Sequence, residues 1–385
     1  MSDDIKDVIR DINAIYNKRC GYSVDLLNPP YKKERRLLPT GIYVIDKYSC
    51  GGEADNNATM VVGDEGSGKS SYAAKQAASL QRKYPGKIIY YIDMESHYMD
   101  SLEQLEQHGV DTDPNNGFLL IGPNTTDAMG DVMLDTIEKH PDKICGIIID
   151  SITSSISAKS ENKSIEDAVM ADKAAPFTKV MDKYEQIRRI CFGNTALPPK
   201  MLLVNHTRAN FNRRTPYSPE KVIAGGQKVR DSAISITWLS KVKGEVDSHK
   251  RSTRRNFTAK SYKDKSTRNM PEILEFSMCV SPNEQIPQGA IDDYNAVIND
   301  AKYYGFLEGW KLNCVDIKES FSTKKDLISF LIDNQDVYTK LKAACIANYR
   351  VEVGLPATNR SEPDFLLAYL GEDWINEAAK KTKKA

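Results

Sequence analysis

The sequence predicts an α/β fold in which a mostly parallel central sheet is flanked by helices. Short apolar segments alternate with segments of helical periodicity along the first half of the chain, a pattern typical of parallel sheets. A glycine-rich loop joins the first of these strands to a helix, and two later apolar strands run directly into acidic residues. In such sheets the carboxyl ends of the strands meet at one edge, where ligands bind.

The glycine-rich loop has the full pattern of a phosphate-binding loop. Residues 63–70 read GDEGSGKS, between a short apolar strand (59–62) and an alanine-rich helix expected over 70–83. Glycines let the backbone close around a polyphosphate, while Lys69 can reach its β/γ oxygens and Ser70 can ligate Mg²⁺. The alternative is a glycine-rich turn that binds nothing. The expected phosphate contacts are Gly63, Asp64, Glu65, Gly66, Ser67, Gly68, Lys69, Ser70 and Ser71.

Length and composition restrict the function classes. The 385 residues are 40% hydrophobic, enough for one large α/β core and a smaller lobe. Fifty-three basic residues balance fifty-three acidic ones, and this balance alone argues neither for nor against nucleic acid. Seven scattered cysteines without a CxxC pair indicate neither a disulfide framework nor a zinc site. We find no apolar leader and no run of about 18 apolar residues, so we expect a cytoplasmic protein with no membrane partner.

Three regions are expected along the chain. Residues 3–17 carry apolar side chains at helical spacing and precede a proline-containing, basic linker, so residues 1–36 are expected to form a helical arm. The apolar stripe of this arm packs either on its own core or on a neighbouring subunit. Residues 37–280 form the core, and residues 281–385 form an accessory lobe with a helical pattern over 324–349 and a lysine-rich tail.

An acidic pair follows the strand predicted over 87–92. Asp93 and Glu95 would lie at the carboxyl end of this strand, beside a bound nucleotide. A carboxylate there can position and polarise an attacking water, and Glu95 is the candidate for that role. The alternative is a solvated helix cap. A cap is plausible for Asp93 alone and less plausible for Asp93 and Glu95 together.

A further acid ends the apolar run 144–149. A buried strand would hold Asp150 where its carboxylate reaches Mg²⁺ through water. Alone, a hydrophobic run ending in Asp is weak evidence, but the phosphate loop about eighty residues upstream strengthens it. The alternative is a structural turn aspartate. Ser70 and Asp150 are therefore the expected metal-side residues.

Positive charge gathers in the second half of the predicted core. A strand over 201–204 leads into a polar stretch that we expect to be irregular from Ala209 to Gly226. Between residues 206 and 268, sixteen Lys and Arg stand against five Asp and Glu. Basic residues interleaved with aromatics suit a channel for single-stranded nucleic acid, where cations follow phosphates and rings stack on bases. The alternative is a solvated basic face.

Seven motifs in family order resemble the RecA-type recombinases, most closely the phage UvsX branch. They are PTGIYVID, GDEGSGKSS, YYIDMES, IIIDSITS, LLVNHTR, VIAGG and SYKDKS, and the resemblance covers about residues 37–310. It implies a RecA-like P-loop NTPase core with a small C-terminal α/β lobe, and a DNA-dependent ATPase that uses ATP and Mg²⁺. Such proteins form head-to-tail filaments on single-stranded DNA, pair it with double-stranded DNA and exchange strands. Mediators and single-strand-binding proteins are further implied partners, in the host cytoplasm if the chain is of phage origin.

The resemblance also implies roles for individual residues. Glu95 matches the family's catalytic glutamate, and His206 takes the place of the polar switch that senses the γ-phosphate. Asp100 is implied as an adenine contact. Lys263 and Lys265 lie on or just after a strand predicted over 256–262, and they match a lysine pair that reaches the ATP bound by the adjacent subunit. The implied catalytic and metal-side residues are Lys69, Glu95, Lys263, Lys265, Ser70 and Asp150.

Two DNA-binding loops are implied as well. Residues 157–172 correspond to the first loop and residues 207–226 to the second. Phe211 and Tyr217 both fit the aromatic position of the second loop. The implied DNA contacts are Lys173, Arg208, Phe211, Arg213, Arg214, Tyr217, Lys221, Gly225 and Gly226.

Three other functions stay open at this point. A RecA-core replicative helicase would share the phosphate loop and the acids, but it would close into a ring and lack the paired lysines. A recombinase paralogue could bind DNA and load a partner without exchanging strands, although the intact Glu95 and Asp150 argue against this. The third alternative is a degenerate structural filament protein.

Overall fold

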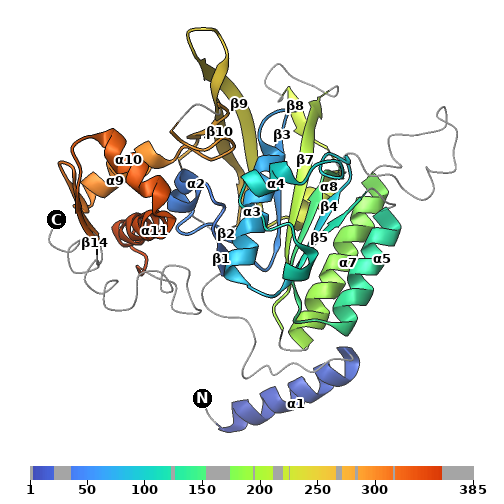
Figure 1. The fold of residues 1–385 in the computed structure, drawn as a ribbon. Coiled ribbons are helices and arrows are strands. Elements are labelled where there is room, and N and C mark those ends of the chain that lie inside the picture. Colours follow the sequence, from blue (N-terminus) through green and yellow to red (C-terminus); the bar gives the residue numbers. More distant parts are fainter. Residues whose placement is uncertain are drawn as a thin grey trace, which may run out of the picture.

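The chain forms a helix-flanked sheet, a smaller C-terminal lobe and an N-terminal helix (Figure 1). This arrangement is seen in a computed structural model. It describes residues 3–20, 36–122, 126–152, 174–193, 196–210, 220–224, 226–265, 271–281, 285–314 and 317–357.

The central sheet has nine strands within the described ranges. They are β3 (Ala58–Gly63), β4 (Ile88–Asp93), β5 (Phe118–Ile121), β6 (Ile144–Asp150), β7 (Lys200–Ala209), β8 (Lys221–Ile223), β9 (Ser235–Val246), β10 (Ser252–Asp264) and β11 (Leu274–Cys279). The order is β11-β10-β9-β3-β7-β6-β4-β5, with β8 paired to β7. Six strands from β9 to β5 pair in parallel, and β8, β10 and β11 pair antiparallel. The prediction of a mostly parallel sheet is confirmed.

Helices cover both faces of this sheet, because its inner strands are apolar on both sides. Val61 of β3 packs toward α2 and α3, whereas its neighbours Met60 and Val62 pack toward α5, α7 and α8. The bounds of these helices are α2 Tyr43–Tyr48, α3 Lys69–Lys83, α5 Thr126–Lys139, α7 Ala174–Gly193 and α8 Gly226–Ser232. The short α4 (Glu103–Gln107) and the 3-10 helix η1 (Pro114–Asn116) connect β4 to β5.

Local patterns located the elements around the phosphate loop correctly. The strands predicted at 59–62, 87–92, 144–149 and 201–204 are β3, β4, β6 and β7, and the helix predicted at 70–83 is α3. Of these, β7 differs most from its prediction, because it continues five residues further, to Ala209.

The stretch after β7 is more regular than predicted. Strand β8 folds back on the end of β7, and the antiparallel register pairs Thr207 with Ile223 and Ala209 with Lys221. Helix α8 then begins at Gly226. The prediction of an irregular chain throughout 209–226 was therefore wrong, because the β-branched Val222 and Ile223 form a short ladder with β7. Residues 211–219 and 225 lie outside the described residues.

Strands β9 and β10 continue past the sheet as a two-stranded ribbon, which rises above the other strands in Figure 1. The strand predicted over 256–262 is the inner part of the longer β10. The outer part of the ribbon, which includes the turn between β9 and β10, carries exposed basic side chains, namely Lys241, Lys243, Lys250, Arg251 and Arg255. Part of the positive charge found between residues 206 and 268 therefore lies on this ribbon and not in the loop predicted over 209–226.

The C-terminal lobe has an apolar core of its own. Its elements are α9 (Tyr294–Tyr303), β12 (Leu307–Glu308), β13 (Lys311–Cys314), β14 (Ile317–Ser320), α10 (Lys324–Asp333) and α11 (Gln335–Glu352). The helical pattern predicted over 324–349 is two helices, because Asn334 leaves the helical conformation, with φ of −119° and ψ of 72°. Tyr43 of α2 is part of the lobe's core, and Lys47 of α2 bonds both Asp300 oxygens at 2.8 Å.

The N-terminal segment forms helix α1 (Asp3–Cys20), as the periodicity predicted. Four of its apolar side chains are about half exposed, namely Ile5, Val8, Ile12 and Ile15. A separate two-stranded sheet of β1 (Leu37–Leu38) and β2 (Glu53–Ala54) borders the core. None of the helices in the described part of the chain combines the length and apolarity needed to cross a lipid bilayer.

Candidate functional site

The predicted phosphate loop joins β3 to α3 at the carboxyl edge of the parallel strands. Gly66 and Gly68 adopt positive φ angles of 70° and 87°, a region that favours glycine. At Gly63 there is no room for a side chain, because a Cβ atom would lie 2.4 Å from the carbonyl oxygen of Leu239. The glycines therefore allow the tight turn by which the chain enters α3.

The loop offers the groups that a polyphosphate needs. The first turn of α3 contains no acidic residue, so the partial positive charge of the helix N-terminus is not cancelled there. The Ser67 hydroxyl is buried and has no hydrogen-bond partner among the described residues. The space beside Gly66 is open, because a Cβ atom on that residue would meet nothing within 4 Å. This space, the Ser67 hydroxyl and the N-terminus of α3 together fit an anionic ligand.

Lys69 lies between the loop and the candidate acids. Its Nζ donates to the carbonyl oxygen of Asp64 at 2.7 Å. Burial lowers the pKa of Lys69, and the carboxylates of Asp150 and Glu95 act in the opposite direction. The side chain is thus placed where a phosphate, the loop backbone and both acids would meet.

Glu95 lies beside the ends of two neighbouring strands. One of its oxygens, Oε1, accepts a hydrogen bond from the Ser151 hydroxyl and lies 3.2 Å from Nε2 of His206. Its other oxygen lies 3.6 Å from Nε2 of His97. Ser151 follows β6 and His206 is in β7, so the sheet order brings these groups together. The prediction that Glu95 lies at the phosphate-loop edge is confirmed.

Asp150 is the buried acid of the site. It is 4% exposed and accepts a hydrogen bond from the Tyr91 hydroxyl at 3.2 Å. Burial raises the pKa of Asp150 to about 6, while a hydrogen bond from Ser70 acts in the opposite direction and the Glu95 carboxylate adds to the rise. The Ser70 hydroxyl and the Asp150 carboxylate are therefore adjacent, and hard oxygen ligands of this kind suit a hydrated Mg²⁺.

The two other acids after β4 differ from each other. Asp93 is buried and accepts backbone hydrogen bonds from Tyr98 at 2.7 Å and from Glu95 at 3.3 Å. Asp93 therefore caps the turn that holds Glu95. The alternative of a solvated helix cap was wrong for Asp93, because its carboxylate is buried and the capped segment is a turn and not a helix. Asp100 lies exposed after that turn, and its adenine contact stays a prediction.

Three of the residues predicted to contact DNA are described. Arg208 is exposed on β7 and is paired with Val222, and Gly226 begins α8. The Lys221 ammonium bonds the carboxylate of Asp64 in the phosphate loop. The first predicted DNA loop (157–172) lies outside the described residues. So do Lys173, Phe211, Arg213, Arg214, Tyr217 and Gly225.

The predicted lysine pair lies away from the phosphate loop of its own chain. Lys263 pairs with Ile236, which pairs with Met60, three residues before Gly63. That separation is roughly 10 Å along the strand direction, away from the phosphate side. Lys263 Nζ donates to the carbonyl oxygens of Arg230 at 2.6 Å and of Asp231 at 3.0 Å, at the end of α8. Lys265 is exposed just beyond β10.

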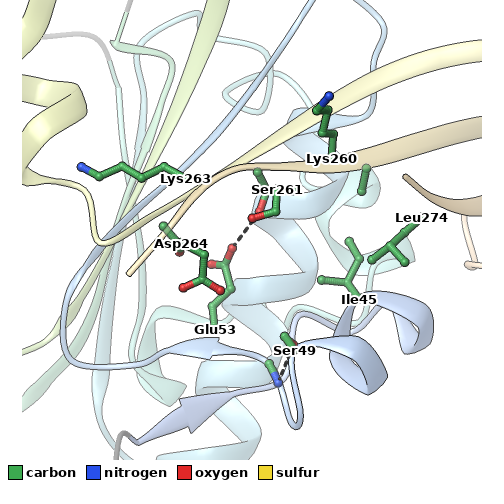
Figure 2. A pocket seen from close by; sticks show the side chains of 12 residues that line it. Ile45, Ser49, Glu53, Lys260, Ser261, Lys263, Asp264 and Leu274 are labelled. Atoms are coloured by element: carbon green, nitrogen blue, oxygen red, sulfur yellow. Dashed lines mark hydrogen bonds between the residues drawn. The ribbon is translucent and has the colours of Figure 1, made fainter. Parts of the chain in front are cut away.

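A small, partly open hollow lies near this amino edge, and Figure 2 shows it from close by. Glu53 and Asp264 point into it, whereas Lys263 points away. Glu53 is held by Thr237 at 3.2 Å and by the buried Lys200 at 3.2 Å. No residue of the phosphate loop lines this hollow, so it is distinct from the candidate nucleotide site.

Sequence reasoning missed several neighbours of the candidate acids. Ser151 donates a hydrogen bond to Glu95, and Tyr91 donates one to Asp150. His97 lies near Glu95. Ser151 directly follows Asp150, a proximity that could have marked it. Tyr91 is one residue of a continuous apolar strand, and nothing in the sequence shows which of its aromatic side chains faces the acid.

A scan against protein-family models finds no match to the chain, and a search of curated proteins finds none either. Function is therefore inferred from the motifs and from the geometry of the site.

Proposed function

We propose that this protein is an ATP-dependent recombinase of the RecA type, which forms a filament on single-stranded DNA and exchanges strands. The observation that carries the proposal is the placement of its two sets of candidate groups. The phosphate loop, Glu95 and Asp150 share the carboxyl edge of the sheet, while Lys263 lies toward the other edge. Each copy of the chain then carries two half-sites at opposite edges of its sheet. A complete site forms only where the first half-site of one copy meets the second half-site of another.

The first half-site is suited to ATP hydrolysis. Glu95 is the group that would orient a water and accept its proton, with Ser151 and His206 fixing the carboxylate through Oε1. Lys69 would contact the phosphates, and Ser70 with Asp150 would hold Mg²⁺. When bound, this metal neutralises charge that develops on the transferred phosphoryl group.

The second half-site supports head-to-tail assembly. A lysine beside a neighbour's γ-phosphate would stabilise charge in the transition state, as cations do in other phosphoryl-transfer enzymes. The apolar stripe of α1 is about half exposed, and it is a further surface that a neighbouring copy could cover. Heterologous contacts of this kind build open helical filaments when their rotation does not close a ring.

The basic ribbon supports binding to DNA. Lys241 and Lys243 are both exposed on β9, beyond Leu239, which pairs with Gly63 of the phosphate loop. The ribbon extends past the same edge that carries the phosphate loop (Figure 1). Cations in this position could follow the phosphates of a strand that lies across the carboxyl edge.

The test combines turnover with imaging. Phosphate release from ATP is measured with and without single-stranded DNA, and the same mixtures are examined by electron microscopy. We expect DNA to stimulate hydrolysis and filaments to form on it, followed by strand exchange with a homologous duplex. Hexameric rings would favour the helicase instead, and DNA binding without exchange would favour the paralogue.

A further inference from the structure

The carboxylate of Asp64, the second residue of the phosphate loop, is bonded by both strands of the β7–β8 hairpin. The Thr207 hydroxyl of β7 donates to Oδ1, and the Lys221 ammonium of β8 donates to Oδ2. The hairpin register places these donors near one another, because Thr207 pairs with Ile223 and Ala209 pairs with Lys221. The Asp64 carboxylate therefore joins both strands of the hairpin to the phosphate loop, in addition to the pairing of Gly63 with His206.

This carboxylate is an unfavourable neighbour for a triphosphate. Hydrogen bonds from Lys221 and Thr207 hold the pKa of Asp64 below its usual range, so the group is ionised at neutral pH. The backbone carbonyl of Asp64 accepts the hydrogen bond from Lys69, so Asp64 lies within the loop that would wrap the phosphates. The negative charges of a triphosphate bound in this loop would repel the carboxylate, and a nearby cation can cancel that repulsion.

The ion pair contributes little to folding. The side chains of Asp64 and Lys221 are 54% and 51% exposed, and exposed pairs of this kind add little to stability. The main effect of the ion pair should therefore be on the affinity for a charged ligand that binds beside it. The ligand that the loop fits carries several negative charges, so loss of the compensating cation would weaken binding more than it weakens the fold.

We propose that Lys221 is a nucleotide-affinity residue, which acts by neutralising the Asp64 carboxylate beside the bound phosphates. The inference rests on the proposed ATP-binding function and assigns a role at the same site. It places Lys221 at the nucleotide, where the sequence resemblance implied contact with DNA alone.

The test is a double-mutant cycle on ATP binding, measured by calorimetry without DNA. Lys221→Met should weaken ATP binding roughly tenfold, because the carboxylate is left uncompensated. Adding Asp64→Asn to that variant should restore the affinity, because the repelling charge is removed. Lys221→Arg should bind ATP as the unaltered chain does. The effect on ADP should be smaller, because ADP carries less charge.

Lys228→Met is the matched control. Its ammonium pairs with Asp182 at 3.1 Å and is 50% exposed, but it lies on α8 and away from the loop. This variant should bind ATP normally. Unchanged affinity in Lys221→Met, or an equal loss in the single and double variants, would overturn the inference while ATP binding by the unaltered chain stands. If the unaltered chain binds no ATP, the proposed function falls and the inference falls with it.

Discussion

The two edges of the central sheet differ in what they can do alone. At the carboxyl edge, groups from four segments converge: the loop after β3, the turn after β4, the end of β6 and the end of β7. At the amino edge, the Lys263 ammonium donates to the backbone carbonyls of Arg230 and Asp231 on α8, and the nearby hollow is lined by carboxylates, hydroxyls and lysines as well as apolar groups. Under the proposed function, the first edge holds most of an active site and the second completes the site of a neighbouring copy.

The largest effect is expected at the carboxyl edge, from Glu95→Gln. The amide keeps an acceptor for the Ser151 hydroxyl but cannot take a proton from water, so turnover should fall roughly 100-fold or more. Nucleotide binding should be kept, and complexes with DNA should live longer in ATP. Steady-state phosphate release and nucleotide titration measure both quantities. Glu138→Gln, at an exposed position of α5, is the control. Turnover within a few-fold of the unaltered chain would move the catalytic role to another residue.

The second prediction asks whether the two edges belong to one site. Glu95→Gln and Lys263→Ala should each lack DNA-stimulated hydrolysis. In an equimolar mixture, random head-to-tail assembly leaves about a quarter of the interfaces with both groups intact, so about a quarter of normal activity should return. Phosphate release from the mixture is compared with the mean of the separate variants. No gain above that mean, with co-assembly verified, would show that the lysine does not act across subunits.

The smallest effect is expected from the ribbon that rises beyond the carboxyl edge. Reversing Lys241 and Lys243 to Glu should make the salt dependence of single-strand binding shallower, by roughly 0.7 in slope for each lost phosphate contact. The control reverses Lys139 and Lys143, exposed lysines near the start of β6 at the amino edge. Binding is titrated across a salt series. Equal slopes for the ribbon variant and the unaltered chain would place the DNA path elsewhere.

The parts of the fold that local patterns define were predictable. The phosphate loop occupies contiguous residues, and β3 and α3 on either side of it have the expected apolar run and helical pattern. Strand β8 was missed, because three residues become a strand only through pairing with β7. The outer part of β10 was missed for the same reason, since its polar residues are ordered by the ladder with β9.

The candidate site was predictable in its acids but not in their partners. Asp150 ends the apolar strand β6 and Glu95 follows β4 by two residues, and both positions are visible in the sequence. The contact between Glu95 and His206 joins residues 111 positions apart, and it depends on β7, β6 and β4 being consecutive in the sheet. Hydrophobic periodicity identifies strands but does not give their order. The link from Lys221 to Asp64 was hidden in the same way.

Helix α2 belongs to two cores at once. Ile45 packs with α3 and the central sheet, whereas Tyr43 packs inside the C-terminal lobe and bonds Asp300 through its hydroxyl at 2.7 Å. A chain ended before the lobe would therefore leave Tyr43 with an uncovered ring and Lys47 without its carboxylate partner. The six-residue helix α2 thus packs in both apolar cores, so loss of the lobe would also disturb a helix that packs on the central sheet.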